Sequence, residues 1–333
     1  MTRAAVVGAG SWGTALANLL AGRGETVTLW AYEPEVADEI NRRHRNDLFL
    51  PDAPLLPALR ATNDLAEAVT GADLVVSAAP SHAVRRVMAS AAPLLGTGAV
   101  VVSASKGLEP DTHKRMSEVL AEVLPAGAAI AALSGPTFSR EVYERQPTAA
   151  VAAAAAAATA QRAQAAISVP YFRLYTNDDV VGVELAGALK NVVAIAAGIL
   201  DGLGMGNNTR AALITRGLAE IARLGVALGA RPATFAGLAG MGDLLMTATG
   251  PLSRNRSLGI EIGKGRTLEE VLARRLSVAE GVGTARAAVD LATQVKVELP
   301  IAQEVARVLF EQKPPRQAIG DLMERSLKSE TWS

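Results

Sequence analysis

The hydrophobic pattern of the first half of the chain predicts strands that alternate with helices. From residue 4 to about residue 175, short valine-rich runs are separated by segments of helical periodicity. Such alternation is typical of an α/β fold in which a parallel, doubly wound sheet carries helices on its faces. We interpret the alanine tract after Pro147 as a strand and then a helix from about Thr159, because one helix over 149–168 would leave no strand between two helical blocks. The predicted strands span residues 4–8, 26–30, 73–79, 99–105, 128–133, 148–153 and 171–175.

Two further segments complete the outline of the chain. The stretch LFLPDAPLLP at 48–57 holds three prolines, which predicts an irregular loop near the edge of the first domain. After about Asp178 the alternation stops and longer helical patterns follow, separated by glycine and proline. This change predicts an α/β domain over residues 1–178 and an all-helical domain over residues 179–333. The predicted helices span residues 180–202, 208–229, 253–264, 284–295 and 299–311.

Composition narrows the class of protein. The 333 residues include 33 basic and 33 acidic side chains, and half are hydrophobic, which argues against a nucleic-acid binder or a polybasic membrane protein and favours a small-molecule ligand. The sequence has no cysteine, so disulfides, thiolate metal sites and a cysteine nucleophile are excluded, and a reducing cytoplasmic location is compatible. The longest uninterrupted apolar run, Ala149 to Ala158, has ten residues, too few to span a membrane, and the N-terminus lacks the pattern of a signal peptide.

The first predicted strand leads into a glycine-rich turn. Gly8, Gly10 and Gly13 have the spacing G-x-G-x-x-G, directly after a strand and at the start of a helix. Glycines there allow a tight turn and let the backbone approach a pyrophosphate, which sits at the N-terminus of the helix. The position in the first βα unit favours dinucleotide binding over a purely structural turn.

The residues after the second predicted strand leave the choice between NAD and NADP open. Glu33 lies twenty residues after Gly13, where a carboxylate holds the ribose of NAD, but it equally suits the first turn of the next helix. Arg42, Arg43 and Arg45 could reach a 2'-phosphate, although a solvated helix end also explains them.

A lysine interrupts the most apolar helical pattern of the chain. In ELAGALKNVVAIAAGIL, residues 184–200, fourteen of seventeen residues are Ala, Val, Leu, Ile or Gly, so the helix is predicted to be buried. Its neighbours on the helix, three and four residues away, are all uncharged, and none can neutralise Lys190. A partner must therefore come from another part of the chain.

Other polar residues gather at predicted loops. Lys106 follows a predicted strand at the carboxyl edge of the sheet, where doubly wound folds bind ligands. Thr137 follows a second predicted strand at the same edge. Thr137 or Ser139 also suits the alternative role of a helix cap. Arg254, between Ser253 and Asn255, suits a phosphate, whereas a cap at Ser253 beside exposed arginines is the alternative. His44, His82 and His113 lie in separate segments without metal-ligand spacing, so no metal site is expected.

Seven segments together resemble one family. GAGSWGTALA, SASKGLE, SGPTFSRE, the stretch from Glu184 to Glu220, GLAGMGDLLMT, SRNRSLG and AEG occur in the order found in the bacterial NAD(P)-dependent glycerol-3-phosphate dehydrogenases. The resemblance covers nearly the whole chain. It implies a Rossmann domain followed by a helical domain, and interconversion of dihydroxyacetone phosphate and sn-glycerol 3-phosphate for phospholipid synthesis. It also makes a homodimer the expected state, without membrane insertion.

The resemblance also implies individual roles. Lys190 matches the catalytic lysine of the family, with Asp243 as its carboxylate. One departure is Tyr32, where many relatives carry arginine or histidine, and it weakens any prediction of NADP preference. The implied substrate residues are Lys106, Gly135, Thr137, Lys190, Asn191, Asp243, Thr247, Ser253, Arg254 and Asn255. The dinucleotide residues that the resemblance implies are Ser11, Trp12, Lys106, Ser139, Arg254, Val278 and Glu280. They join the glycines of the turn, Gly8, Gly10 and Gly13, and Tyr32, which could stack on the adenine.

Burial predicts how Lys190 acts. A lysine has a reference pKa of about 10.4, and an apolar environment lowers it unless a carboxylate restores the charged form. We expect the lysine to protonate the C2 oxygen of the ketone while Arg254 and Asn255 hold the phosphate. Two other hypotheses are a Rossmann-plus-helical dehydrogenase for a different hydroxy acid and a non-catalytic dinucleotide sensor.

Overall fold

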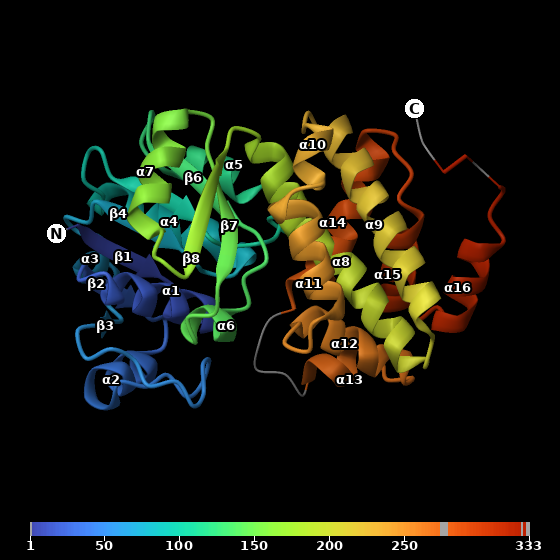
Figure 1. Cartoon of the computed structure of the whole chain (residues 1–333), viewed down its shortest axis with the longest axis horizontal. Helices are drawn as coiled ribbons and strands as arrows, with labels where there is room; N and C mark the ends of the chain where they lie inside the picture. Colours follow the sequence, from blue (N-terminus) through green and yellow to red (C-terminus); the bar gives the residue numbers. More distant parts are fainter. Residues whose placement is uncertain (1, 274–278, 328, 331–333) are drawn as a thin grey trace.

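The structure is a computed structural model and describes residues 2–273, 279–327, 329 and 330. Its two parts lie side by side, with the sheet and its helices in the first half of the chain and a bundle of helices in the second (Figure 1). The long helix α8, Val180–Gly202, begins three residues after the last strand and runs into the bundle.

The described residues form one eight-stranded sheet in the order β3-β2-β1-β4-β5-β6-β7-β8. All seven predicted strands are present, with ends that shift by up to two residues. The prediction missed β3, whose three residues follow the proline-rich loop and pair with β2 at the edge of the sheet. The strands are β1 Arg3–Val7, β2 Thr26–Trp30, β3 Arg60–Thr62, β4 Leu74–Ser77, β5 Val100–Ser103, β6 Ala129–Ser134, β7 Thr148–Ala153 and β8 Phe172–Asn177.

The sheet is not parallel throughout, which corrects the prediction. Strand β7 runs antiparallel to β6, while β8 runs parallel to β7. The connection from β6 to β7 holds only the five-residue helix α6, whereas the crossover between parallel strands is usually a longer helix. The chain therefore turns back beside β6. The first six strands keep the order 3-2-1-4-5-6 of a dinucleotide-binding sheet.

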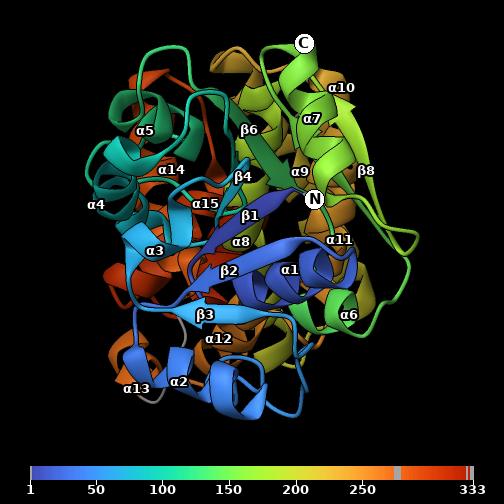
Figure 2. The same cartoon turned by 90° about the vertical axis from the view of Figure 1, so that its left-hand side faces the viewer.

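Helices cover both faces of the sheet, as a doubly wound fold requires (Figure 2). One apolar core lies between the sheet and α1, α2, α6 and α7, and a second lies on the opposite face beneath α3, α4 and α5. These helices are α1 Ser11–Gly22, α2 Pro34–Arg43, α3 Leu65–Val69, α4 Ser81–Ala91, α5 Met116–Val123, α6 Ser139–Tyr143 and α7 Ala157–Ile167, with a 3-10 turn at Ala92–Leu94.

The second half is helical, as predicted, and all five predicted helices are present. The short elements of nine residues or fewer were not predicted, because they span too few turns for a clear apolar period. In chain order the elements are α8 Val180–Gly202, α9 Asn207–Ala227, α10 Pro232–Phe235, a π-helix at Leu238–Gly242, α11 Asp243–Thr249, α12 Arg254–Gly263, α13 Leu268–Ala273, α14 Glu280–Gln294, α15 Pro300–Phe310 and α16 Pro315–Met323.

Helix α8 is the centre of the bundle, and glycines bring α12 against it. A Cβ on Gly198 would lie 2.0 Å from the carbonyl oxygen of Arg256, and one on Gly259 would lie 2.1 Å from that of Ile195. By length and mean hydropathy, 1.7, α8 could cross a membrane, which corrects the expectation that no segment approaches such a length. However, 83% of the apolar window is buried inside the structure, so α8 packs as a core helix.

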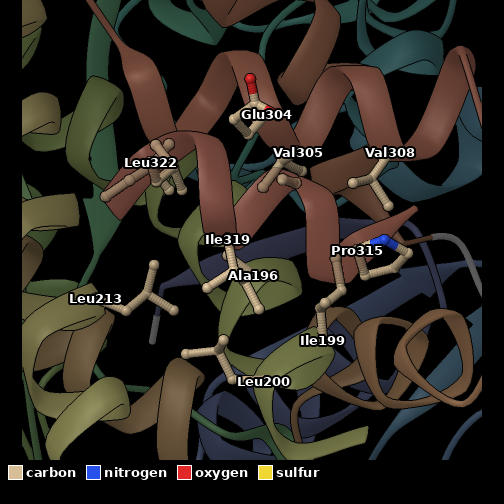
Figure 3. Close-up of a pocket in the computed structure, with 12 residues that line it drawn as sticks. Ala196, Ile199, Leu200, Leu213, Glu304, Val305, Val308, Pro315, Ile319 and Leu322 are labelled. Atoms are coloured by element: carbon tan, nitrogen blue, oxygen red, sulfur yellow. The ribbon is translucent and has the colours of Figure 1, made fainter. Parts of the chain in front are cut away.

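A small cavity lies where α16 packs on α15, α8 and α9 (Figure 3). Its volume is about 50 Å³, and Glu304 is the one charged residue among the twelve that line it. Glu304 already pairs with Arg307 at 2.7 Å and Lys313 at 2.5 Å. Ligand pockets typically reach about 300 Å³ or more, so this cavity is a packing void and not a nucleotide site.

Candidate active site

Lys106 extends from the carboxyl edge of the sheet, three residues after β5 ends. Its Nζ donates to the carbonyl oxygen of Gly135 at 2.6 Å, to Thr137 Oγ1 at 3.1 Å and to Asp243 Oδ2 at 2.9 Å. Thr137 in turn donates to the Gly135 carbonyl at 3.1 Å. Neither Thr137 nor Ser139 caps α6 through its side chain, so the helix-cap interpretation is wrong and Thr137 faces Lys106.

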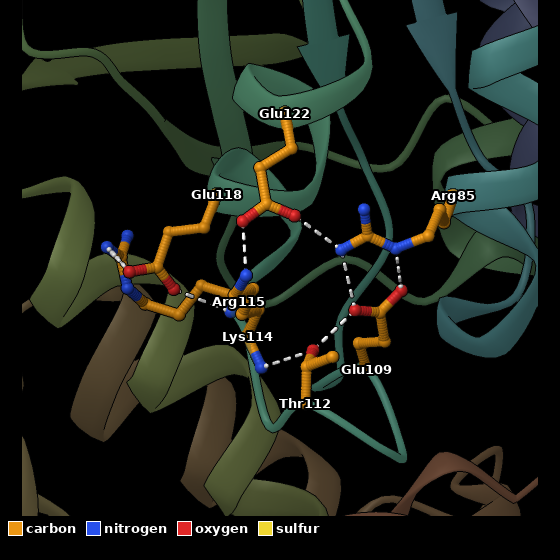
Figure 4. Close-up of polar contacts among 7 residues, drawn as sticks. All are labelled: Arg85, Glu109, Thr112, Lys114, Arg115, Glu118 and Glu122. Carbon is orange, nitrogen blue, oxygen red and sulfur yellow. Dashed lines mark hydrogen bonds and ion pairs between the residues drawn. The ribbon is translucent and has the colours of Figure 1, made fainter.

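A network of ion pairs fixes the loop that follows Lys106 (Figure 4). The buried carboxylate of Glu109 accepts two bonds from Arg85 of α4, at 2.7 and 2.9 Å, and one from Thr112. Arg85 also pairs with Glu122 of α5 at 2.7 Å, and Lys114 pairs with the same carboxylate. The loop is thus tied to both neighbouring helices, which holds the backbone beyond Lys106 in place.

Lys190 finds the partner that its own helix cannot supply. Its Nζ donates to Asp243 Oδ1 and, at 2.8 Å, to Thr247 Oγ1, and both partners belong to α11. Lys190 is 5% exposed and Asp243 is fully buried. Each oxygen of the Asp243 carboxylate therefore serves one lysine, Oδ1 for Lys190 and Oδ2 for Lys106. The π-helix that precedes Asp243 is an element often found at functional sites.

The environment of Lys190 brings its pKa to about 7. Burial is the largest cause, because it disfavours the charged ammonium, and the positive charge of Lys106 acts in the same direction. The negative charge of Asp243 opposes both and favours the ammonium. A lysine with a pKa near neutrality can give up or accept a proton under physiological conditions.

The two halves of the chain meet closely around α8. A Cβ on Gly187 would lie 2.5 Å from Ser134 Oγ of β6, so only glycine lets the sheet edge approach the helix here. One turn earlier, the buried Glu184 accepts from Ser117 N at 2.8 Å and from Arg115 Nη1 at 2.9 Å. These contacts hold α8 against the first half of the chain, so that Lys106 and Lys190 reach the same carboxylate.

The triplet Ser253, Arg254 and Asn255 begins α12 next to Lys190. Ser253 caps the helix, since its hydroxyl accepts from Arg256 N at 3.2 Å, so the predicted cap is present. Asn255 Nδ2 donates to Asn191 Oδ1 at 2.9 Å, which ties the triplet to the residue after Lys190. Asn255 Oδ1 accepts from Gly281 N at 3.0 Å. Arg254 is exposed at the helix N-terminus, where the helix dipole also favours an anion.

The glycine turn has the shape that a pyrophosphate needs. Gly8 has a φ of 116°, and a Cβ on Gly13 would lie 1.8 Å from the Gly8 carbonyl oxygen, so both positions require glycine. A Cβ on Gly10 would meet no atom of the described chain within 4 Å, so the turn opens onto free space. Among the described side chains none caps α1, which begins at Ser11. Its first N–H groups therefore suit a dinucleotide phosphate.

The other predicted dinucleotide residues lie in different environments. Trp12 packs against Phe172, with ring centroids 6.3 Å apart, and its buried Nε1 has no hydrogen-bond partner in the described chain. Tyr32 is 65% exposed, edge-on to Trp30. Glu280 accepts from Ser81 N at 3.1 Å and from Ser81 Oγ at 2.5 Å, which joins α14 to the N-terminus of α4. Ser139 begins α6, and Val278 lies outside the described residues.

The remaining candidates do not converge on the site. Arg42 pairs with Asp38 one turn earlier on α2, and Arg45 pairs with Asp47 at 3.0 Å, which favours the solvated-helix-end interpretation. Glu33 lies immediately before α2 with its side chain half buried. Within the described residues no group of acidic or histidine side chains could hold a metal ion.

Several residues with clear positioning contacts were not predicted from the sequence. Ser81 holds Glu280, Glu184 holds the N-terminus of α5, and Gly187 allows the close approach of β6. A signal existed for Ser81, because it follows Pro80 at the carboxyl end of a predicted strand. None existed for Glu184 or Gly187, since only the packing of distant segments defines their neighbours.

The first half of the chain has the sheet of a dinucleotide-binding domain. The helical bundle brings the buried side chains of Lys190 and Asp243 to the edge of this sheet. This combination defines the class of two-domain pyridine-nucleotide-dependent dehydrogenases. Residues 3–160 match the family described as the NAD-dependent glycerol-3-phosphate dehydrogenase N-terminus, and residues 179–320 match the corresponding C-terminus. The chain belongs to this family, which confirms the resemblance and the fold class predicted from the sequence.

Individual relatives agree with this assignment. A protein of Geobacter sp. strain M21 named glycerol-3-phosphate dehydrogenase [NAD(P)+] is 57% identical over 328 residues, which is 98% of each chain. The crystal structure of glycerol-3-phosphate dehydrogenase from Coxiella burnetii superposes with a TM-score of 0.93 at 38% identity, covering 97% of this chain and 99% of that one. A ketopantoate reductase family structure from Ralstonia eutropha, at 16% identity and a TM-score of 0.61, covers 97% of this chain and all of that one and shares the fold alone.

Proposed function

We propose that this chain catalyses the reversible, NAD(P)H-dependent reduction of dihydroxyacetone phosphate to sn-glycerol 3-phosphate, which supplies phospholipid synthesis. The observation that carries the proposal is the convergence of Lys106 and Lys190 on the buried carboxylate of Asp243, beside the α12 N-terminus with Arg254. Family membership, with curated relatives at 57% identity over nearly the full length, supports the substrate and the cofactor.

The substrate phosphate binds at the N-terminus of α12. The Arg254 guanidinium forms charge-assisted bonds to it, the dipole of α12 adds a favourable field, and Asn255 orients the first turn through Asn191. Lys106, held by the Gly135 carbonyl and Thr137, contacts the hydroxyl or ketone end of the substrate. Fixing the phosphate at one end places C2 within reach of Lys190.

Lys190 acts as the general acid in reduction. When bound, the reduced nicotinamide supplies the hydride that the substrate carbon C2 receives. The Lys190 ammonium donates its proton to the C2 oxygen, so the ketone becomes a secondary alcohol and the lysine becomes a neutral amine. Asp243 keeps the lysine protonated beforehand, and Thr247 accepts a hydrogen bond that orients Nζ. In oxidation the neutral amine accepts the same proton.

The dinucleotide binds across the carboxyl edge of the sheet. Its pyrophosphate lies on the turn of Gly8, Gly10 and Gly13 and on the first N–H groups of α1 at Ser11 and Trp12. Tyr32 contacts the adenosine end. Ser139 lies on the nicotinamide side, and Arg254 and Glu280 face the cofactor. We also propose a homodimer and a cytoplasmic location, supported by the family resemblance and by the absence of cysteine from the 333 residues.

The deciding experiment measures oxidation of NADH and of NADPH in the presence of dihydroxyacetone phosphate. We expect turnover with at least one cofactor, and the ratio of the two kcat/KM values gives the preference. Dihydroxyacetone without phosphate serves as the matched control and should react at least about a hundredfold less efficiently, because Arg254 then has no anion to bind. No turnover with either cofactor would overturn the assignment, and equal use of the phosphate-free ketone would refute the role of Arg254.

A further inference from the structure

The fully buried side chain of Asn46, which belongs to a different loop, contacts the glycine turn. Asn46 lies in the loop after α2, and its Nδ2 donates to the carbonyl oxygen of Ala9 at 2.8 Å and to Thr14 Oγ1 at 2.8 Å. Thr14 Oγ1 donates to the same Ala9 carbonyl at 3.1 Å. Ala9 is the residue between Gly8 and Gly10, so two side chains fix one peptide group of the turn.

The orientation of this peptide decides where the Gly10 N–H points. A trans peptide is planar, and its C=O and N–H point in opposite directions. The Ala9 carbonyl points toward Asn46 and Thr14, so the N–H of Gly10, on the same peptide, points away from them. The space around Gly10 is open, since a Cβ there would meet no described atom within 4 Å. The donor therefore points away from Asn46 and Thr14 before any ligand arrives.

The loop that carries Asn46 is itself held in place. The Asn46 carbonyl accepts from Leu50 N at 2.8 Å, and its Oδ1 accepts from Phe49 N at 3.3 Å. Further along, Tyr143 Oη of α6 donates to the carbonyl of Pro54 at 2.7 Å. The loop that carries Asn46 is therefore held in place by contacts that do not involve the glycine turn.

We propose that Asn46 is a positioning residue for the dinucleotide: it orients the Ala9–Gly10 peptide so that the Gly10 N–H faces the diphosphate. It acts through the turn and touches neither substrate nor reacting atoms. The proposal rests on the proposed function only in taking a dinucleotide as the ligand. Without Asn46 the Ala9–Gly10 peptide can rotate, and the dinucleotide must restrict this rotation when it binds. Dinucleotide affinity falls, while the chemistry at Lys190 is unchanged.

The test measures the Kd of NADH and NADPH by fluorescence titration without substrate, together with kcat and the KM of dihydroxyacetone phosphate at saturating cofactor. Asn46→Ala and Thr14→Val should each raise the Kd about tenfold, as the loss of one to two buried hydrogen bonds predicts. Thr14→Ser keeps the hydroxyl and should restore the affinity to within about twofold of wild type. For Asn46→Ala, kcat should stay within about twofold of wild type.

Asn41 offers a matched control. Its Nδ2 donates to the Ala61 carbonyl at 2.7 Å and its Oδ1 accepts from Ala61 N at 3.0 Å, so it ties α2 to β3 without reaching the glycine turn. Asn41→Ala should leave the Kd unchanged within about twofold. The proposal is overturned if Asn46→Ala also leaves the Kd within about twofold of wild type, or if Asn41→Ala raises the Kd as much as Asn46→Ala does. It is also overturned if Asn46→Ala lowers kcat by the same factor as the affinity.

The measurements distinguish a failure of the Asn46 proposal from a failure of the proposed function. If Asn46→Ala does not fold, judged by its thermal transition, the Thr14→Val and Thr14→Ser pair decides alone, and equal Kd values for the two would refute the proposal. If wild type binds NADH but reduces no dihydroxyacetone phosphate, the proposed function fails, while the affinities still test the role of Asn46.

Discussion

Replacing Asp243 by asparagine tests the charge balance of the site. The substitution keeps the shape of the side chain and removes the negative charge that Lys106 and Lys190 share. Burial and the charge of Lys106 already lower the pKa of Lys190, and Asp243 opposes them. Without the carboxylate the pKa falls further, so at neutral pH the lysine loses the proton that reduction requires.

Coulomb's law gives the size of this effect. Two unit charges about 4 Å apart interact by about 4 kcal/mol at an effective dielectric constant of about 20. One pKa unit corresponds to about 1.36 kcal/mol, so losing the carboxylate lowers the pKa by about 3 units from its value of about 7. At pH 7.5 the protonated fraction of Lys190 then falls by roughly 10³. We therefore expect kcat/KM for reduction to fall by about 10² to 10³.

The assay is the pH dependence of kcat/KM for dihydroxyacetone phosphate at saturating cofactor. The acid must be protonated, so the wild-type rate of reduction should be level below about pH 7 and fall above it, whereas glycerol 3-phosphate oxidation should rise through the same range. In Asp243→Asn the fall should begin at much lower pH.

Asp201 provides the control for this substitution. It also lies on α8 and bridges two arginines, with Arg256 Nε at 2.7 Å and Arg210 Nε at 3.1 Å. Asp201→Asn should lower stability without moving the pH profile. A wild-type profile in Asp243→Asn, with kcat/KM within about fivefold of wild type, would show that Asp243 does not control the protonation of Lys190.

Three further substitutions test the phosphate site, the glycine turn and the packing of α12. Arg254→Ala should raise the KM of dihydroxyacetone phosphate by about 10- to 100-fold in steady-state assays, because a charge-assisted bond contributes about 1.5–3 kcal/mol, and an unchanged KM would place the phosphate elsewhere. Gly13→Ala should abolish NADH binding in a fluorescence titration, because its Cβ would lie 1.8 Å from the Gly8 carbonyl oxygen, and retained affinity would contradict the close approach. Gly198→Val should lower the free energy of unfolding in urea by about 3 kcal/mol or more, since α12 cannot remain in contact, whereas a loss under about 1 kcal/mol would mean that α12 shifts freely.

Much of the fold follows from the sequence because strand and helix periods are local. The predicted helix over 180–202 has the bounds of α8, and the valine-rich runs coincide with strands. The direction of β7 was not predictable from the same pattern, since an apolar run has the same period in either direction. Strand β3 is too short to show a period, and only its pairing with β2 defines it.

The sequence showed that Lys190 needs a partner from another segment, but the spacing of residues alone could not identify that partner. A lysine without a partner on its own apolar helix predicts a distant carboxylate, and the family resemblance indicated Asp243, which the structure brings into contact with it. That Lys106 uses the other oxygen of the same carboxylate is a property of the packed chain. The contact of Asn46 with the glycine turn was likewise beyond prediction, since 37 residues separate Asn46 from Ala9 and no local pattern relates them.

The role of Lys190 as the general acid is tested most directly by the single-turnover rate of reduction in Lys190→Met. Methionine fills a similar volume without a proton to donate, so the rate at pH 7 should fall by about 10² to 10⁴, and its dependence on pH near 7 should disappear. NADH affinity should stay within about threefold of wild type, which shows that the dinucleotide site is intact. If a folded Lys190→Met protein reduced dihydroxyacetone phosphate within a few-fold of the wild-type rate, Lys190 would not be the general acid.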